Sequence, residues 1–319
     1  MNRVPQVTLG STALQVSKLC YGTLTMGPLQ RDLSPEQGAA LLKHAFDNGI
    51  NFLDTAQIYG TYPHIRELIR TVPRRKLVIM TKSYAWSVET AQAAVSEALK
   101  ALGTDYIDIF LMHEQESEHT LRGHDDALQE YLRMKKQGMI RAVGLSTHRI
   151  EAVRASLKRP EIEVLFPIFN PTGIGIHDGT IREMELALEA ARLKGKAVIG
   201  MKALGGGHLL TSYEASLQFS LRHPLLDAVA VGMQSRAEID ANITLAAGRP
   251  LSEAAKYAAL SKSRKLHIGD ECTGCGNCVF ICRQRALELD GRQAAVDHER
   301  CILCSYCARK CPEFCIKVI

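Results

Sequence analysis

Nine of the ten cysteines lie after residue 270, and eight of these repeat one spacing twice, C-x2-C-x2-C-x3-C. Three thiolates at such intervals bind one iron–sulfur cube, while the fourth, displaced by three residues, binds the neighbouring cube. The spacing therefore predicts two 4Fe-4S clusters that exchange their fourth ligands and transfer single electrons. The expected sets are Cys272, Cys275, Cys278 and Cys311 for one cluster, and Cys301, Cys304, Cys307 and Cys282 for the other.

Other uses of these cysteines fit the spacing less well. Zinc sites use two ligand pairs separated by a long spacer, which a triplet plus one does not provide. Cys20 and Cys315 fall outside the repeated pattern, and we expect both to be structural residues. No disulfide is predicted, so we expect a reducing compartment such as the cytoplasm.

Charge and hydropathy argue against two kinds of partner, nucleic acids and membranes. The formal net charge is +5, and residues 251–319 hold 11 Lys or Arg against 8 Asp or Glu. Two oxidised cubes with their thiolates add about −4, which brings this tail near neutral and removes the main support for nucleic-acid binding. Because no apolar run has the length of a membrane span or of a signal-peptide core, we expect no membrane partner either.

The elements that precede the cysteines form a repeat. Eight short apolar runs recur 22 to 35 residues apart, the length of one strand, one helix and two loops. Segments of helical period separate them, so eight similar units favour a closed (β/α)8 TIM barrel over an open doubly wound sheet. The predicted strands are Leu19–Gly22, Asn51–Asp54, Leu77–Thr81, Ile107–Met112, Ala142–Leu145, Val164–Phe169, Ala197–Met201 and Asp227–Val231.

Capping residues support the helices between these strands. Residues 34–49, 87–103, 123–138 and 179–195 read as amphipathic helices that end at Gly, and the first two begin with Ser. The opening residues 7–19 alternate apolar and polar side chains around a Gly-Ser pair, which predicts a hairpin beneath the barrel.

The chain therefore divides into three parts. We expect a barrel over residues 1–250, a connecting helix over 251–266, and a small iron–sulfur domain over 267–319.

Four polar side chains are expected at one rim of the barrel. Asp54, Lys82 and His113 end consecutive strands, and Tyr59 follows in a loop. Chemistry in such barrels takes place at the carboxyl ends of the strands. Hydride transfer to a carbonyl carbon leaves charge on the oxygen, so the site needs a proton donor and a stabiliser of that charge.

Each rim residue has an expected role in this chemistry. Tyr59 can donate the proton, with its pKa lowered by the ammonium of Lys82. Asp54 can hold Lys82 in place, and a neutral His113 can donate a hydrogen bond to the carbonyl oxygen. These roles predict an oxidoreductase that reduces a small carbonyl substrate.

The four rim residues match one for one the Asp, Tyr, Lys and His tetrad of the aldo-keto reductase family, which the chain resembles over residues 1–248. The segments NFLDTAQIYG, VIMTK, LMH and GMIRAVGLS carry the resemblance. Residues 267–319 similarly resemble a bacterial two-cluster ferredoxin. The resemblance implies an α/β barrel fused to a ferredoxin-like α+β domain, with NADP(H) as the coenzyme.

The family resemblance also implies a nicotinamide site, although an ordinary βα turn explains its glycines equally well. Glu238 stands where an Arg commonly holds the 2′-phosphate of NADPH, and Arg236 is the nearest replacement. The implied coenzyme-binding residues are Ser146 and Met201 at the ring, Lys202, Gly205 and Gly206 at the pyrophosphate, and Ser235, Arg236 and Asn242 at the adenosine phosphate.

The two halves are chemically mismatched. Nicotinamide transfers two electrons as hydride and each cube transfers one, while no flavin-binding fingerprint is evident between them, which leaves a flavin open. The favoured interpretation is a carbonyl reductase that uses NAD(P)H, the clusters, or both, with a redox partner protein at the C-terminal module. The alternatives are an electron-transfer adaptor whose barrel binds a partner or cofactor, and a reductase whose clusters are structural or sense oxygen.

Overall fold

A closed barrel of eight parallel strands forms the body of the protein, in the order β10-β3-β4-β5-β6-β7-β8-β9. The computed structural model describes residues 4–261 and 264–319. Each predicted strand forms within a few residues of its expected bounds, so the (β/α)8 fold is confirmed. The strands are β3 (Leu19–Gly22), β4 (Phe52–Asp54), β5 (Val78–Ser83), β6 (Ile107–Met112), β7 (Ile140–Thr147), β8 (Val164–Pro167), β9 (Ala197–Gly200) and β10 (Ala228–Gly232).

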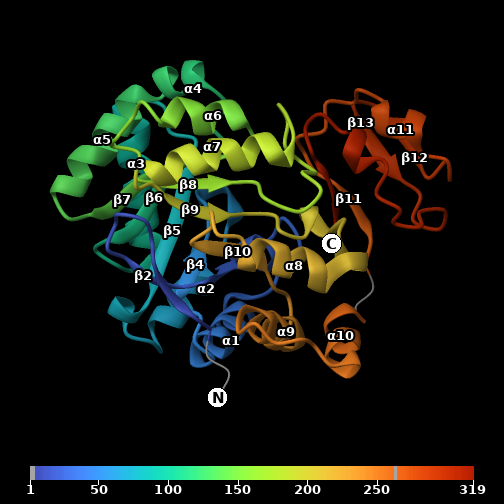
Figure 1. Cartoon of the computed structure of the whole chain (residues 1–319), viewed down its shortest axis with the longest axis horizontal. Helices are drawn as coiled ribbons and strands as arrows, with labels where there is room; N and C mark the ends of the chain where they lie inside the picture. The colour runs from blue at the N-terminus through green and yellow to red at the C-terminus, as the bar shows by residue number, and fades with distance from the viewer. Residues whose placement is uncertain (1–3, 262–263) are drawn as a thin grey trace.

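Helices surround the barrel (Figure 1), and their caps follow the sequence signals. Ser34 and Ser87 each accept a hydrogen bond from a first-turn backbone N–H within a capping box. Gly103 ends one helix in the left-handed conformation, at φ 69°. The helices are α1 (Pro35–Asp47), α2 (Tyr62–Ile69), α3 (Val88–Leu102), α4 (Glu118–Gly123), α5 (Asp125–Lys136), α6 (Ile150–Ser156), α7 (Ile181–Leu193), α8 (Tyr213–Arg222) and α9 (Arg236–Ala246).

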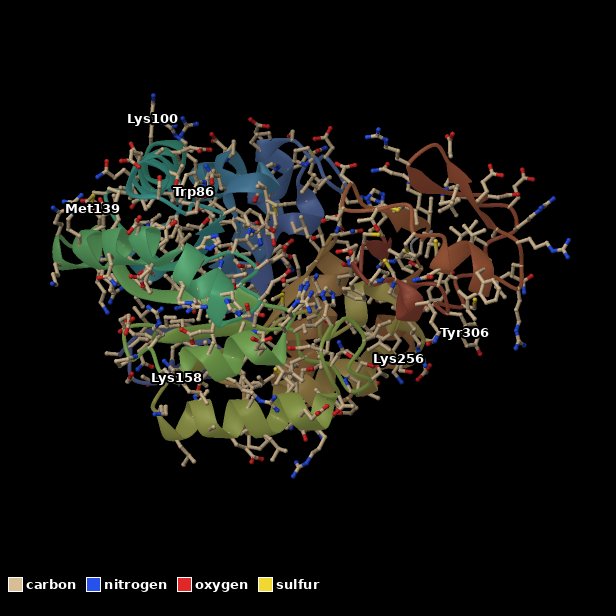
Figure 2. The ribbon with its side chains drawn as sticks, turned by 90° about the horizontal axis from the view of Figure 1, so that it is seen from above. Trp86, Lys100, Met139, Lys158, Lys256 and Tyr306 are labelled. Atoms are coloured by element: carbon tan, nitrogen blue, oxygen red, sulfur yellow. The ribbon has the colours of Figure 1, made fainter. Side chains whose placement is uncertain are left out.

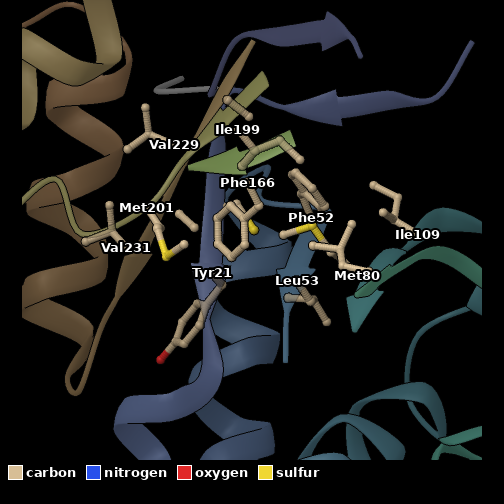
Figure 3. Packing of buried hydrophobic residues seen from close by; sticks show 14 of the residues in the cluster. Tyr21, Phe52, Leu53, Met80, Ile109, Phe166, Ile199, Met201, Val229 and Val231 are labelled. Atoms are coloured by element: carbon tan, nitrogen blue, oxygen red, sulfur yellow. The ribbon is translucent and has the colours of Figure 1, made fainter. Parts of the chain in front are cut away.

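Apolar side chains fill the interior of the barrel. Phe52, Met80 and Ile109 are fully buried and come from three neighbouring strands (Figure 3). Nearer the mouth, Phe166 and Met201 continue this packing. Because the interior is filled in this way, ligands are expected only at the open end of the barrel.

A hairpin closes the opposite end, as the sequence predicts. Strands β1 (Gln6–Thr8) and β2 (Gln15–Ser17) pair antiparallel. Gly10 lies at their turn with φ 44°, where a Cβ atom would come within 2.5 Å of the backbone nitrogen of Ala197. Only glycine allows the turn to approach the start of β9 this closely.

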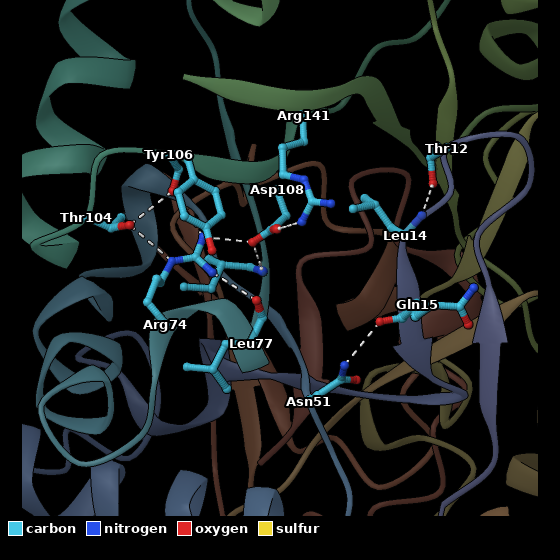
Figure 4. A network of polar contacts seen from close by, with 11 residues as sticks. Thr12, Leu14, Gln15, Asn51, Arg74, Leu77, Thr104, Tyr106, Asp108 and Arg141 are labelled. Carbon is cyan, nitrogen blue, oxygen red and sulfur yellow. Dashed lines mark hydrogen bonds and ion pairs between the residues drawn. The ribbon is translucent and has the colours of Figure 1, made fainter. Parts of the chain in front are cut away.

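A buried carboxylate organises the polar contacts near this closed end (Figure 4). Asp108 is fully buried and accepts hydrogen bonds from Arg74 at 2.7 Å, Arg141 at 2.8 Å and the backbone N–H of Ile79 at 2.9 Å. Three donors satisfy the carboxylate, as a buried charge requires.

The C-terminal module lies to one side of the barrel (Figures 1 and 2), and its first and last strands pair with each other. Strand β11 (Leu266–Ile268) runs antiparallel to β14 (Ile316–Val318), and β12 (Leu287–Asp290) to β13 (Gln293–Val296). The short helix α11 (Asn277–Ile281) completes the module.

The connecting helix is shorter than the predicted range 251–266. Helix α10 covers only Glu253–Leu260, and Leu266 already belongs to β11. Residues 262 and 263 of this prediction lie outside the described residues. Leu266 follows a sequence of helical pattern, but it forms a strand because it pairs with β14.

One barrel side chain fixes the module in place. The Nε2 atom of buried His208 donates to the carbonyl oxygen of Ile316 at 2.8 Å, and Nδ1 lies 2.8 Å from the hydroxyl of Ser305. A ring that donates at Nε2 and accepts at Nδ1 is neutral. His208 therefore contacts both the last strand and the second cysteine-rich segment.

Of the described helices, none has the length and apolar character needed to cross a membrane.

Candidate active site and cluster module

Asp54 and Lys82 form a buried ion pair at the mouth of the barrel. The Nζ atom of Lys82, in β5, lies 2.6 Å from Oδ1 of Asp54, at the end of β4, and 2.8 Å from the carbonyl oxygen of Thr55. Both side chains are almost completely buried. Burial raises the pKa of Asp54, and the charge of Lys82 opposes that shift. The pair fixes the position of the ammonium through two hydrogen bonds.

Tyr59 lies against this ammonium through its ring. Nζ of Lys82 is 4.7 Å from the centroid of the Tyr59 ring, and no hydrogen bond joins it to the Tyr59 hydroxyl within residues 4–261 and 264–319. Burial, followed by the charge of Asp54, raises the pKa of Tyr59 well above its usual value. The expected lowering of the Tyr59 pKa by Lys82 is therefore wrong for this structure, since burial and, after it, the charge of Asp54 raise this pKa.

His113 completes the predicted group of four residues. Its ring lies edge-on to that of Tyr59, with centroids 6.1 Å apart, and stacks on Tyr84 at 4.3 Å. Burial, with the charges of Lys82 and Lys202, lowers the pKa of His113 well below its usual value. The imidazole is therefore neutral near pH 7, as the proposed hydrogen-bonding role requires.

Tyr84 and Glu114 form a part of the site that sequence reasoning missed. The hydroxyl of Tyr84 donates a hydrogen bond to Oε2 of Glu114 at 2.5 Å. This contact holds the tyrosine ring against His113. Each residue lies two or three positions after a predicted strand, and Glu114 adjoins His113. That position was the available signal.

The main cavity starts at Tyr59 and continues to α9. Its volume, including space that is open to solvent, is about 1120 Å³. Asp54 and Tyr59 line one end, whereas Glu238 and Asn242 line the other. The cavity is therefore lined both by residues of the catalytic group and by residues of the helix to which the sequence assigns the adenosine phosphate.

The implied coenzyme residues divide into two groups in the structure. The hydroxyl of Ser146 is buried and accepts the backbone N–H of Glu114 at 2.9 Å. Ser235 caps α9, and Arg236 points to solvent as an exposed residue. Within the described residues, the cavity is lined by Met201, Lys202, Gly206 and Asn242 but not by Ser146, Gly205, Ser235 or Arg236.

Arg264, and not the exposed Arg236, has its guanidinium at the cavity. Its Nη2 atom donates to Oε1 of Glu238 at 3.1 Å, and both residues line the cavity. The other Glu238 oxygen accepts the backbone N–H of Gln234 at 2.8 Å. No sequence signal identified Arg264, because its position depends on how the module packs against the barrel.

The glycine turn after β9 is packed against the end of the chain. A Cβ atom at Gly206 would lie 2.8 Å from Cδ of Lys317, and one at Gly207 would lie 2.1 Å from the carbonyl oxygen of Val318. These glycines therefore accommodate β14, which forms one wall of the cavity together with Ile319. The alternating sequence after Cys315 could have predicted a strand, but not its position.

The eight module cysteines surround two separate cavities in the exchanged sets that the spacing predicts. No three His, Cys, Asp or Glu side chains in the described ranges converge as they do around a single metal ion. The thiols instead line two cavities, four thiols from the repeated pattern in each. One is lined by Cys272, Cys275, Cys278 and Cys311, and the other by Cys282, Cys301, Cys304 and Cys307.

Backbone N–H groups support this assignment. Ala294 donates to Sγ of Cys272 at 3.4 Å, and Ala286 donates to Sγ of Cys282 at 3.3 Å. Hydrogen bonds of this kind stabilise thiolate ligands and tune cluster potentials. Cys315 also lines the first cavity, with its sulfur 3.4 Å from that of Cys311.

Comparison with known proteins agrees with both halves of the molecule. The aldo/keto reductase family model matches residues 18–216, and a 4Fe-4S dicluster domain matches residues 264–312. The chain belongs to the aldo/keto reductase family. Both resemblances predicted from the sequence are thereby confirmed.

Individual relatives place this aldo/keto reductase at a distance from characterised proteins. L-galactose dehydrogenase of Arabidopsis thaliana is 24% identical over 285 residues, covering 76% of this chain and 88% of that protein. The uncharacterized oxidoreductase YqkF of Bacillus subtilis is 24% identical over 289 residues, covering 77% and 92%.

Solved structures share the barrel. A putative aldo-keto reductase from Pseudomonas aeruginosa has a TM-score of 0.65 at 26% identity, covering 76% of this chain and 94% of that one. The holo form of aldo-keto reductase AKR11C1 from Bacillus halodurans has a TM-score of 0.66 at 21% identity, covering 81% and 96%, and supports the fold alone. In this aldo/keto reductase, the family-matched region provides Tyr59 and Lys82, whereas Arg264 and Lys317 come from the C-terminal region.

Proposed function

We propose that this protein reduces the carbonyl group of a small molecule at the mouth of its barrel, with electrons from NAD(P)H, through two 4Fe-4S clusters, or both. The observation that supports this proposal is the buried Asp54–Lys82 pair beside Tyr59, on a cavity that the cluster module helps to enclose. The catalytic residues we assign are Asp54, Tyr59, Lys82 and His113.

The roles of these residues follow from their protonation states. Tyr59 has a raised pKa and is a neutral phenol near pH 7, so it holds the proton that the reduced oxygen needs. Neutral His113 donates a hydrogen bond to that oxygen and orients the substrate. Lys82, fixed by Asp54, holds a positive charge against the Tyr59 ring beside the reacting oxygen.

The coenzyme would occupy the main cavity and supply hydride when bound. Met201 offers a thioether to the ring, and Lys202 and Gly206 lie along the middle of the cavity. We assign Arg264, paired with Glu238, to the adenosine end, in place of Arg236. A 2′-phosphate would compete with Glu238 for this guanidinium, so NADPH binding is predicted to require that the pair opens.

The clusters supply single electrons when bound, and the two cysteine sets are proposed to hold one each. Phe280 and Tyr306, exposed apolar residues of the module, provide contacts for a redox partner protein. The domains are proposed as a barrel over residues 1–250 and an iron–sulfur module that begins with β11 at Leu266 and extends to residue 319, in a reducing compartment such as the cytoplasm.

A substitution at Tyr59 tests the proposal against its alternatives. Anaerobically purified Tyr59→Phe is expected to lose carbonyl-dependent NADPH oxidation by about 10²–10⁴-fold, as removal of a general acid does. Tyr106→Phe is the matched control, because it makes the same change near the closed end, where Tyr106 lies under Arg74. If Tyr59→Phe retains full turnover, the reductase proposal fails.

The cluster alternatives are distinguished in the same preparation. In an electron-transfer adaptor, Tyr59→Phe leaves cluster reduction and electron transfer to a partner intact while no carbonyl is consumed. If the clusters are structural or sense oxygen, Cys304→Ser changes stability or oxygen response but leaves turnover per folded molecule. Anaerobic titration with NADPH, with and without flavin, measures whether the iron–sulfur absorbance bleaches.

A further inference from the structure

Two lysine side chains face one phenyl ring where the barrel meets the module. Nζ of Lys317 lies 3.7 Å from the centroid of the Phe314 ring, and Nζ of Lys202 lies 5.1 Å from it. Phe314 is only 1% exposed, and the two lysines that contact its ring are half-buried. Because Lys202 follows β9 and Lys317 belongs to β14, the pair exists only while the module is docked.

Neither ammonium has a carboxylate partner among the described residues. Nζ of Lys202 donates to Nε2 of His148 at 2.9 Å, and the contact of Lys317 is with the Phe314 ring. Glu114 and Glu271 act on Lys202 only from a distance. Burial lowers the pKa of Lys202 to about 8. Burial, followed by the charge of Lys202, also lowers the pKa of Lys317 well below its usual value, and an anion bound beside the two amines would favour their charged forms.

The backbone around this pair is strained. Lys202 has φ 55° and Phe314 has φ 48°, which are left-handed conformations that side chains other than glycine rarely adopt. A Cβ at Gly175 would come within 2.8 Å of Cδ1 of Phe314, so glycine is required there as well. Strain of this kind is concentrated at functional sites, where the surrounding structure maintains it.

Both lysines line the main cavity, which Tyr59 also lines. We propose that Lys202 and Lys317 together bind the oxyanion group of a ligand in this cavity, either a carboxylate or a phosphate. The inference rests on the proposed function and adds a substrate class to it. A carboxylate on the carbonyl substrate is the favoured source, which makes oxo acids the expected substrates. The pyrophosphate of the coenzyme is the other source of the same chemistry.

Two probes with one carbon skeleton separate charge from carbonyl chemistry. Phenylglyoxylate carries a carboxylate beside its ketone, and its methyl ester does not. Lys317→Met in the holoprotein is expected to lower kcat/KM for the acid by about tenfold to a hundredfold, the usual effect of losing a charged hydrogen bond. The ester is expected to change less than about twofold, because it has no charge to lose.

Three further proteins control for folding and net charge. Lys317→Arg keeps the charge and is expected to restore most of the acid activity. Lys202→Met tests the second ammonium independently. Lys100→Met removes one charge from the exposed surface of α3, distant from the module (Figure 2), and should leave both probes unaffected. Iron content and circular dichroism confirm that each variant is folded.

Binding measurements identify the source of the anion. Calorimetric titrations with NADPH, inorganic pyrophosphate and phenylglyoxylate are compared for the wild type and Lys317→Met. If NADPH and pyrophosphate lose affinity while the two ketones are affected equally, the site binds the coenzyme phosphate. If phenylglyoxylate alone loses affinity, the site binds the substrate carboxylate.

The proposal is overturned if a folded Lys317→Met protein binds all three anions as the wild type does. Failure of the proposed reductase function has a different signature. In that case neither ketone is turned over by the wild type, yet the affinity for an anion still falls in Lys317→Met.

Discussion

The closed end and the mouth of the barrel differ in how their charged and polar groups are paired. Near the closed end, Asp108 accepts hydrogen bonds from two arginines and a backbone N–H, so its charge is satisfied within the protein. At the mouth, the half-buried Lys202 and Lys317 have no carboxylate partner, and Nδ1 of His113 has no hydrogen-bond partner, among the described residues. The closed end is therefore organised for stability, and the mouth retains polar groups for a ligand.

Substitution of Lys82 is expected to give the largest effect, because its ion pair with Asp54 contributes both to stability and to catalysis. Lys82→Met should reduce carbonyl turnover by about 10²–10⁴-fold and destabilise the fold by about 3–5 kcal/mol, since Asp54 is left buried without its partner. The double variant Asp54→Asn/Lys82→Met should recover stability but not activity. Anaerobic kinetics and denaturant unfolding measure the two effects, and recovered activity in the double variant would contradict the assigned role.

Asp108 should affect stability alone. Asp108→Ala leaves two guanidinium groups without their buried acceptor, so unfolding free energy is expected to fall by about 3–5 kcal/mol. Turnover per folded molecule should be unchanged, because the residue lies near the opposite end from Tyr59. A loss of kcat in folded protein would show that the two ends are not independent.

Gly207 tests whether the module completes the mouth. Gly207→Ala places a methyl group against the backbone of Val318 at a position with φ 91°, and should destabilise docking of β14 by about 1–3 kcal/mol. Faster hydrogen exchange in residues 316–319 is the expected readout. Gly138→Ala is the control, since it has φ 81° but no atom within 4 Å of the added carbon. Equal effects in the two variants would indicate that backbone strain alone is responsible.

The pH dependence should be the smallest effect. The lowered pKa of His113 keeps it neutral above about pH 6.5, and the raised pKa of Tyr59 keeps its proton to above about pH 10. With the uncharged ester, kcat should therefore vary by less than about twofold between pH 7 and pH 9. Ionisation of Lys202 is not expected to change kcat for the ester, because the ester carries no anionic group for Lys202 to bind. An inflection within this interval would require another ionisable group in the mechanism.

Sequence reasoning succeeded where local pattern determines structure. The eight strands follow from apolar runs at regular spacing, and Ser34 and Ser87 cap their helices as their types predict. The exchanged cysteine sets follow from spacing in the same way. These features depend on neighbours in the chain, so the residue order contains the information needed.

The remaining features depend on docking between distant segments. The order of residues does not indicate that Arg264 meets Glu238, or that Lys317 lies beside the Phe314 ring at the cavity. The pKa of Tyr59 was mispredicted for a related reason. Its direction depends on burial and on how far Asp54 offsets Lys82, which only the packed structure reveals.

His208 links the integrity of the module to access at the barrel. Its two nitrogens contact Ser305, in the second cysteine-rich segment, and Ile316, in the strand that walls the cavity. If the second cysteine set holds a cluster, we expect loss of that cluster to free Ser305 and, through His208, to weaken the packing of β14 against the cavity. Water would then enter the main cavity. We expect turnover to be lost in air under these conditions while the barrel is still folded.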